Sequence, residues 1–147
     1  MTAVVQRDDL LGSWLLEEWR IDYPGGRGPS WPFGRDAIGL LAYMADGWMS
    51  ATMCWRARSP LSAASALQAD EASKARSYQE YLTYGGRWRL EGSTIVHDVT
   101  MSLNPTLIGS RQRRDANIER GALILSASES AGAGATRVHY IRWRRPD

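Results

Sequence analysis

The sequence predicts an all-β fold: an eight-stranded antiparallel up-and-down barrel with one helix inserted near the middle. Short segments of alternating polar and apolar residues follow one another along the chain, and tight turn signals such as Asp46-Gly47 separate them. One segment alone has a helical composition. Consecutive hairpins favour a closed barrel because closure removes exposed strand edges. The 147 residues suffice for a single domain, 1–147, with a substantial core.

Each element follows from a local pattern. Segment 11–23 interleaves aromatic and aliphatic residues with charges and is the first strand, and the Gly- and Pro-rich stretch after it is a loop. Segments 38–44 and 48–55 form a hairpin around 45–47, since glycine accepts a positive φ. Segment 61–81 is rich in alanine and has no β-branched residue, so we expect the helix there. Further strands are expected at 82–90, 94–103, 108–118, 122–128 and 136–145.

The composition points to a small-molecule partner. Seven Trp and six Tyr accompany a single Phe, and such rings can line an apolar cavity that still orients a ligand. The alternative is a core that Trp simply fills. Arginines cluster at 111–114 and 142–145, but acidic residues nearly balance the basic ones, and alternate strand residues face opposite sides. We therefore expect no nucleic-acid partner.

Other classes of site lack their sequence signals. The single cysteine, Cys54, permits no intrachain disulfide. No set of His, Cys, Asp or Glu has metal-ligand spacing, and no phosphate or dinucleotide motif occurs, so we predict no metal and no cofactor. The longest apolar run, 38–45, is too short to span a bilayer, and segment 1–9 has no apolar signal core. We expect no membrane partner and a cytoplasmic location; the oligomeric state stays open, a homodimer included.

Several motifs, in order along the chain, resemble a known family. Leu11-Gly12-Ser13-Trp14 resembles the Gly-x-Trp opening of lipocalins and related calycin barrels. Later motifs resemble the bacterial and fungal lipocalin-like domain family: Pro32-Phe33-Gly34, Asp46-Gly47-x-Met49-Ser50-Ala51, Tyr84-x-Gly86-Arg87, His97-x-Val99 and Ser102-Leu103-Asn104-Pro105. The resemblance implies a barrel in which Trp14 closes one end beneath Arg142, Arg144 or Arg145. It fixes no reaction, because such proteins range from uncharacterised binders to cofactor-free cyclases of natural-product pathways.

His97 is the first candidate for chemistry. Within 94–103 the face that carries His97 also carries Ile95, Val99 and Met101, and such an apolar face should line the lumen. An imidazole placed there can act as acid, base or ligand anchor. The alternative is a structural histidine bonded to a neighbour.

The first strand leaves two orientations open. If Trp14 points inward, Glu18 and Arg20 share its face and also point inward. Otherwise Trp19 and Ile21 point inward and Glu18 is solvated. We favour the first orientation because the resemblance places Trp14 inside the barrel.

Strand parity places further polar groups in the lumen. In 108–118, Gln112 and Arg114 face inward while Arg111 and Arg113 face solvent. We therefore predict an apolar or amphipathic small molecule bound in the lumen, on which the chain acts as a cofactor-free cyclase or isomerase; the alternative is non-catalytic binding or a structural barrel. The predicted catalytic residues are His97, Glu18 and Tyr84. The predicted ligand-binding residues are Arg20, Tyr43, Met49, Met53, Trp88, Met101, Gln112 and Arg114.

Overall fold

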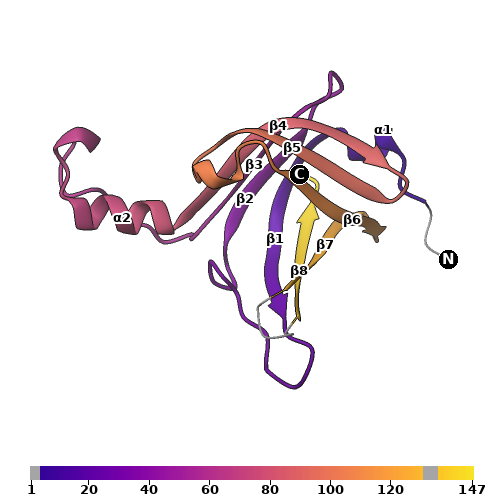
Figure 1. The fold of residues 1–147 in the computed structure, drawn as a ribbon, viewed down its shortest axis with the longest axis horizontal. Coiled ribbons are helices and arrows are strands. Elements are labelled where there is room, and N and C mark those ends of the chain that lie inside the picture. The colour runs from indigo at the N-terminus through magenta and orange to yellow at the C-terminus, as the bar shows by residue number, and fades with distance from the viewer. Residues whose placement is uncertain (1–3, 131–135) are drawn as a thin grey trace.

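The strands close into one barrel. The structure, a computed structural model, describes residues 4–130 and 136–147. Each strand pairs antiparallel with the next, and β8 returns to pair with β1 (Figure 1). The strands are β1 Gly12–Asp22, β2 Ile38–Tyr43, β3 Trp48–Cys54, β4 Tyr81–Glu91, β5 Thr94–Ser102, β6 Arg111–Glu119, β7 Ala122–Ser130 and β8 Thr136–Arg144. The predicted fold class is therefore confirmed.

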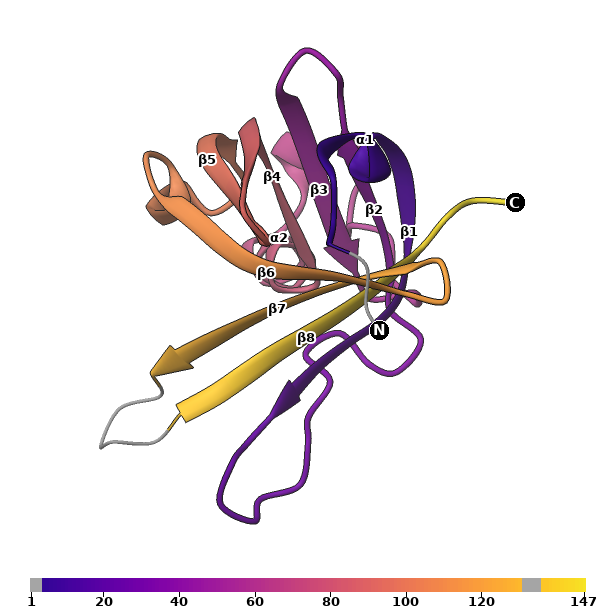
Figure 2. The same cartoon turned by 90° about the vertical axis from the view of Figure 1, so that its right-hand side faces the viewer.

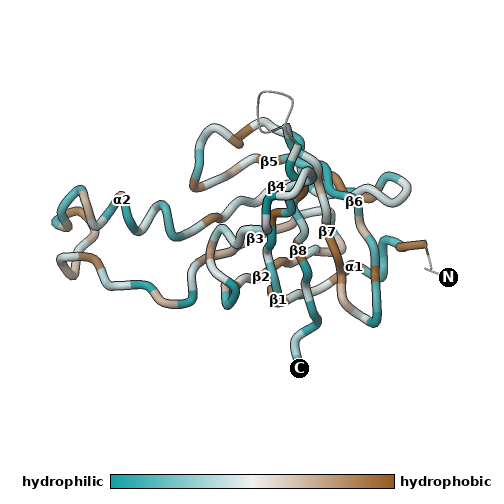
Figure 3. Tube along the Cα trace, turned by 90° about the horizontal axis from the view of Figure 1, so that it is seen from below, coloured by the Kyte–Doolittle hydropathy of each residue, from teal (hydrophilic) through white to brown (hydrophobic). Residues whose placement is uncertain are grey.

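The pattern of hydropathy explains why these segments become barrel strands. Hydrophobic residues are interspersed with hydrophilic ones along the strands (Figure 3). In β8, the buried Ile141 and Trp143 alternate with less buried arginines, because successive side chains point to opposite faces of a sheet. Three predicted turns contain a glycine with positive φ: Gly47 at 92°, Gly92 at 62° and Gly121 at 80°. Glycine adopts this conformation without the steric cost that a Cβ would bring.

One end of the barrel is closed by the first helix. In this helix, α1 (Arg7–Leu10), the Leu10 side chain is completely buried. The Leu10 carbonyl accepts a 3.0 Å hydrogen bond from the Trp14 indole N–H. The Arg145 guanidinium lies 3.7 Å from the centre of the Trp14 ring and donates to the Asp9 and Ser13 carbonyls. The predicted contact between Trp14 and a C-terminal arginine is confirmed, and Arg145 makes it.

The inserted helix is shorter than the sequence predicted and lies outside the barrel. Helix α2 spans Glu71–Gln79 rather than 61–81, and a short 3-10 turn, η1 (Ala66–Gln68), precedes it. The Asp70 carboxylate caps α2 by accepting from the Ser73 N–H at 2.7 Å, which fixes the start of the helix. Figure 1 shows α2 and the chain before it projecting away from the strands. The helix therefore leaves the lumen unfilled.

A β-bulge in β1 overturns the predicted orientation of Glu18 and Arg20. The pairing of β1 with β8 shifts register between Leu16 and Glu18, so Trp14 and Trp19 are both buried although they are five residues apart. Beyond the bulge Glu18 and Arg20 lie on the outer face. There the Arg20 guanidinium binds the Glu18 carboxylate at 2.9 Å, and the Trp31 indole donates to the same carboxylate. The expectation that Glu18 and Arg20 line the lumen is wrong.

A second bulge moves Met101 outward. Gly85 pairs with Met101 but Gly86 pairs with Val99, so β5 carries one extra residue at this point. A Cβ on Gly86 would lie 2.0 Å from the Asp98 carbonyl oxygen, and only glycine permits so close an approach. Met101 is consequently 57% exposed, and its predicted place in the lumen is wrong.

The odd-numbered strands all end at the opposite end of the barrel from α1. Figure 2 shows the arrowheads of β1 and β7 on the side away from α1. The 3-10 turn η2 (Pro105–Leu107), which follows β5, belongs to the same end because neighbouring strands run antiparallel. Asn104 caps η2, so β6 begins only at Arg111 and not at 108 as predicted.

Candidate functional site

A cavity of about 640 Å³ occupies the end of the barrel away from α1. Most of its wall is apolar or aromatic, and the residues that supply this part are Trp19, Leu41, Ala51, Met53, Leu82, Leu107, Leu125, Ala127, Ile141 and Trp143. The polar residues on the wall are Tyr84, His97, Asn104, Gln112, Arg114, Ser128, Glu129, Arg137 and His139. A cavity of this volume, in which defined polar groups face an apolar and aromatic wall, can hold a small molecule and orient it.

His97 lies between two tyrosine hydroxyls. Its Nε2 is 2.7 Å from the Tyr43 hydroxyl, and its Nδ1 is 2.7 Å from the Tyr84 hydroxyl. Tyr43 is 1% exposed and has no other side-chain partner among the described residues, so its hydroxyl is satisfied only by donating to Nε2. A neutral imidazole then carries its proton on Nδ1 and donates it to Tyr84. The Tyr84 hydroxyl hydrogen is left free to point into the cavity.

Burial keeps this chain of groups neutral. His97 is 2% exposed, and burial together with the nearby Arg114 guanidinium lowers its pKa from 6.5 to about 3. Burial also raises the pKa of the Tyr43 hydroxyl well above its usual value, and the pKa of Tyr84 rises for the same reason. At neutral pH the imidazole and both phenols are therefore uncharged, and Tyr84 is a hydrogen-bond donor toward the cavity.

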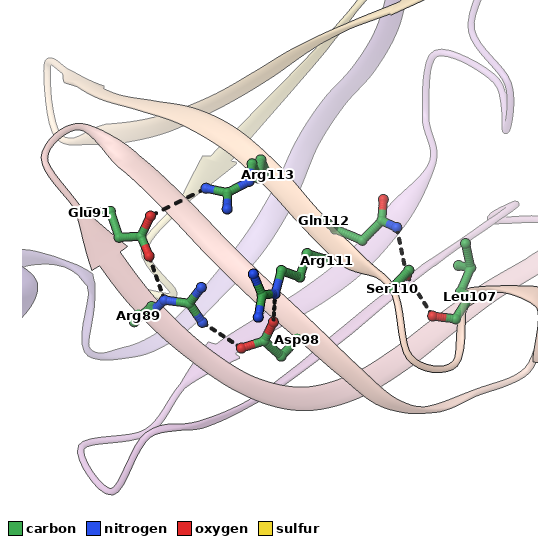
Figure 4. A network of polar contacts seen from close by, with 8 residues as sticks. All are labelled: Arg89, Glu91, Asp98, Leu107, Ser110, Arg111, Gln112 and Arg113. Atoms are coloured by element: carbon green, nitrogen blue, oxygen red, sulfur yellow. Dashed lines mark hydrogen bonds and ion pairs between the residues drawn. The ribbon is translucent and has the colours of Figure 1, made fainter.

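Strand β6 sends alternate side chains to the two faces of the barrel wall. Arg111 and Arg113 lie on the outer face, where they bind the carboxylates of Asp98 and Glu91 (Figure 4). Gln112 and Arg114 lie on the cavity wall, as parity predicted. The Gln112 amide nitrogen donates to the Ser110 hydroxyl at 2.9 Å, and its oxygen accepts from the Arg114 guanidinium at 3.3 Å.

A second polar cluster, which the sequence did not reveal, lies on β7 and β8. The Trp19 indole donates to Nδ1 of His139 at 3.1 Å, and Nε2 of His139 is 2.8 Å from the Glu129 carboxylate. Glu129 also binds Arg137. Because Nδ1 accepts from the indole N–H, Nε2 is the nitrogen that donates to the Glu129 carboxylate. Glu129 and His139 are ten residues apart, and only the hairpin between β7 and β8 brings them together.

The structure separates the predicted site residues into three groups. His97, Tyr84, Met53, Gln112 and Arg114 lie on the cavity wall. Tyr43, Met49 and Trp88 are buried in the core but are not on this wall. Glu18, Arg20 and Met101 lie away from it, for the reasons given above. The catalytic and binding roles of the first group stay predictions.

The described part of the chain holds neither a candidate metal cluster nor a candidate membrane-spanning helix. Within residues 4–130 and 136–147, no group of three or more His, Cys, Asp or Glu side chains is placed to hold a metal ion. Over the same ranges, no helix combines the length and the apolar character needed to cross a membrane.

Comparison with known proteins identifies the family. No curated protein and no solved structure matches the chain significantly. A family model described as a lipocalin-like domain matches residues 11–146, which is nearly the whole chain and includes every strand of the barrel. The match agrees with the closed barrel and its internal cavity, and the chain belongs to the lipocalin-like domain family.

Proposed function

We propose that the protein binds an apolar or amphipathic small molecule in the lumen of its barrel. The observation that carries this proposal is the cavity of about 640 Å³, about half of whose lining residues are aromatic or aliphatic and the rest polar. Burial of a ligand against Trp19, Leu125 and Trp143 would remove apolar surface from water, which is the main favourable term in such binding.

The wall offers a defined hydrogen bond as well as apolar contact. The free hydroxyl hydrogen of Tyr84 supports the binding of a ligand that carries an oxygen acceptor. Tyr43 and His97 hold that hydroxyl in place through hydrogen bonds of 2.7 Å. A donor fixed in this way adds orientation at little entropic cost, because its position is set before the ligand arrives.

The proposal is tested with a neutral fluorescent probe, N-phenyl-1-naphthylamine, whose emission rises in apolar surroundings. Ala127 lies on the cavity wall, and its neighbour Ser126 pairs with Tyr140 on the other face of β7 and β8. Ala127→Trp fills part of the lumen and should weaken probe binding by about tenfold or more, whereas Ser126→Trp should leave it unchanged. Probe binding that survives Ala127→Trp, or no binding to the folded wild type, would contradict the proposal.

A second candidate function is a cofactor-free cyclase or isomerase acting on a polyene or polyketide of a natural-product pathway. The hydrogen-bonded chain of Tyr43, His97 and Tyr84 favours it, because a fixed donor on an apolar wall can polarise a substrate carbonyl. Tyr84→Phe separates the two functions. It should lower turnover by about 10²–10⁴-fold if the hydroxyl is a general acid, but cost only about 0.5–1.5 kcal/mol of affinity if it merely binds.

A further inference from the structure

Arg114 differs from its neighbours on β6 in having no carboxylate partner among the described residues. Arg111 lies 3.3 Å from the Asp98 carboxylate, and Arg113 lies 3.2 Å from the Glu91 carboxylate (Figure 4). Among the described residues Arg114 forms no ion pair, although it is partly buried on the cavity wall. A guanidinium that faces an apolar cavity without a counter-charge is unfavourable, unless a bound group supplies the charge.

Two hydrogen bonds hold the Arg114 guanidinium and leave the rest of it free. One terminal nitrogen donates to the Arg113 carbonyl at 2.8 Å, and the other donates to the Gln112 amide oxygen at 3.3 Å. Ser110 in turn holds the Gln112 amide, and the Leu107 carbonyl accepts from Ser110. A guanidinium has five N–H donors, so about three remain without a partner among the described residues. The group is positioned before any ligand binds.

The ionisable groups on the wall leave one positive charge uncompensated. The Glu129 carboxylate binds Arg137, and these two charges cancel. His139 is bonded to the same Glu129 carboxylate, and His97 is neutral because it is buried between two tyrosines. Arg114 is the remaining charged group on the described wall. A ligand with a single negative charge would therefore neutralise the cavity.

Strand pairing places Arg114 near His97, which holds the Tyr84 hydroxyl. His97 pairs with Gln112 and Ile95 pairs with Arg114, so His97 and Arg114 are diagonal neighbours on one face of β5 and β6. Such neighbours are within reach of long side chains. Tyr84 is bonded to His97 at 2.7 Å, so the guanidinium and the phenol can approach the same ligand group. Arginine matches the planar geometry of a carboxylate, to which it donates two parallel hydrogen bonds.

We propose that the ligand is an amphipathic carboxylic acid whose carboxylate is bound by Arg114 and Tyr84 while its apolar part lies against Trp19, Leu125 and Trp143. This inference rests on the proposed binding function and specifies the class of ligand. The cluster of Glu129, Arg137 and His139 takes no part in binding the carboxylate, because its charges are already paired.

Displacement of N-phenyl-1-naphthylamine by three ten-carbon compounds tests the charge preference in the wild-type protein. The compounds are decanoate, 1-decanol and decylammonium, which share a tail and differ in the charge of the head. Decanoate should displace the probe at about 10- to 100-fold lower concentration than 1-decanol, the range expected for a charge-assisted hydrogen bond. Decylammonium should be the weakest competitor, since it brings a second positive charge into the cavity. The inference is overturned if the order of the three compounds is reversed, or if they compete equally.

Two variants test whether Arg114 causes the preference for decanoate over 1-decanol. Arg114→Met keeps a similar length without the charge and should bring decanoate close to 1-decanol, while the affinity for 1-decanol stays within about twofold. Arg113→Met removes an outward-facing arginine from the adjacent position and should preserve the wild-type order. A preference for decanoate that persists in Arg114→Met overturns the inference but leaves lumen binding intact. Failure of the probe to bind the lumen, shown by equal behaviour of wild type and Ala127→Trp, overturns the proposed function itself.

Discussion

Mild acid should destabilise the fold through His97. The pKa of His97 falls from 6.5 to about 3 on folding because the imidazole is buried without a counter-charge. Between these values the unfolded chain binds a proton that the native state does not, so stability rises with pH. The contribution is fully present above about pH 6.5 and is lost progressively as the pH falls toward 3. At about pH 4.5 the loss should reach roughly 3 kcal/mol, since each pKa unit corresponds to about 1.4 kcal/mol.

Urea unfolding of the wild type and of His97→Phe at several pH values measures this contribution. The variant cannot titrate at position 97, so the difference in unfolding free energy between the two proteins should shrink by roughly 3 kcal/mol between about pH 7.5 and 4.5. His97→Phe also leaves the Tyr43 hydroxyl buried without a partner, which costs about 1–3 kcal/mol at every pH. The double variant Tyr43→Phe/His97→Phe removes that orphaned group and should recover part of the offset, while its pH profile stays parallel to that of His97→Phe.

Parallel pH profiles for wild type and His97→Phe would refute the reasoning. They would mean that His97 takes up a proton as easily in the folded protein as in the unfolded chain. The chain of hydrogen bonds through Tyr43 and Tyr84 would then not be neutral. The argument that Tyr84 offers a free hydroxyl hydrogen to the cavity would fail with it.

Two further predictions concern the ends and faces of the barrel. Trp14→Ala should destabilise the protein by about 3–5 kcal/mol in urea unfolding, because it removes a buried indole that packs beneath Arg145. A variant as stable as wild type would show that the closed end is not packed as described. Met101→Gln should change stability by less than about 0.5 kcal/mol, whereas Met53→Gln should cost several-fold more because Met53 is 6% exposed. Equal costs for the two methionines would contradict the bulge in β5.

The barrel, and the residues of β5 and β6 that line its cavity, can be predicted from the two-residue alternation of side chains along a strand. Alternation persists wherever the ladder is regular, so the alternation within β6 correctly predicted that Gln112 and Arg114 reach the cavity. His97 pairs with Gln112, and Arg114 follows two residues later on the same face. The turns followed from glycine, since Gly47 and Gly92 both need a positive φ. These signals are local, and the sequence carries them in full.

The bulges explain what parity could not predict. In β1 the apolar residues change phase, from Trp14 and Leu16 to Trp19 and Ile21, and no regular strand buries both pairs on one face. That change of phase was visible in the sequence and indicates an extra residue. In β5 the apolar alternation runs unbroken through Met101, so the strand itself gives no signal. The signal lies across the ladder, in the adjacent Gly85 and Gly86, where one backbone approaches another.

The Glu129 cluster was hidden for a different reason, and its pairing bears on how the cavity selects a ligand. His139 has no acidic neighbour in sequence, but the β7–β8 hairpin pairs Glu129 with Arg137 and Ala127 with His139, which brings the carboxylate to the imidazole. A carboxylate free of Arg137 would offset the charge of Arg114 and leave a cavity with no preference for charge. Because Arg137 already neutralises it, the charge of Arg114 stays uncompensated on the wall. The register of the β7–β8 hairpin, which could not be predicted from the sequence, therefore leaves the Arg114 side of the cavity able to select an anion.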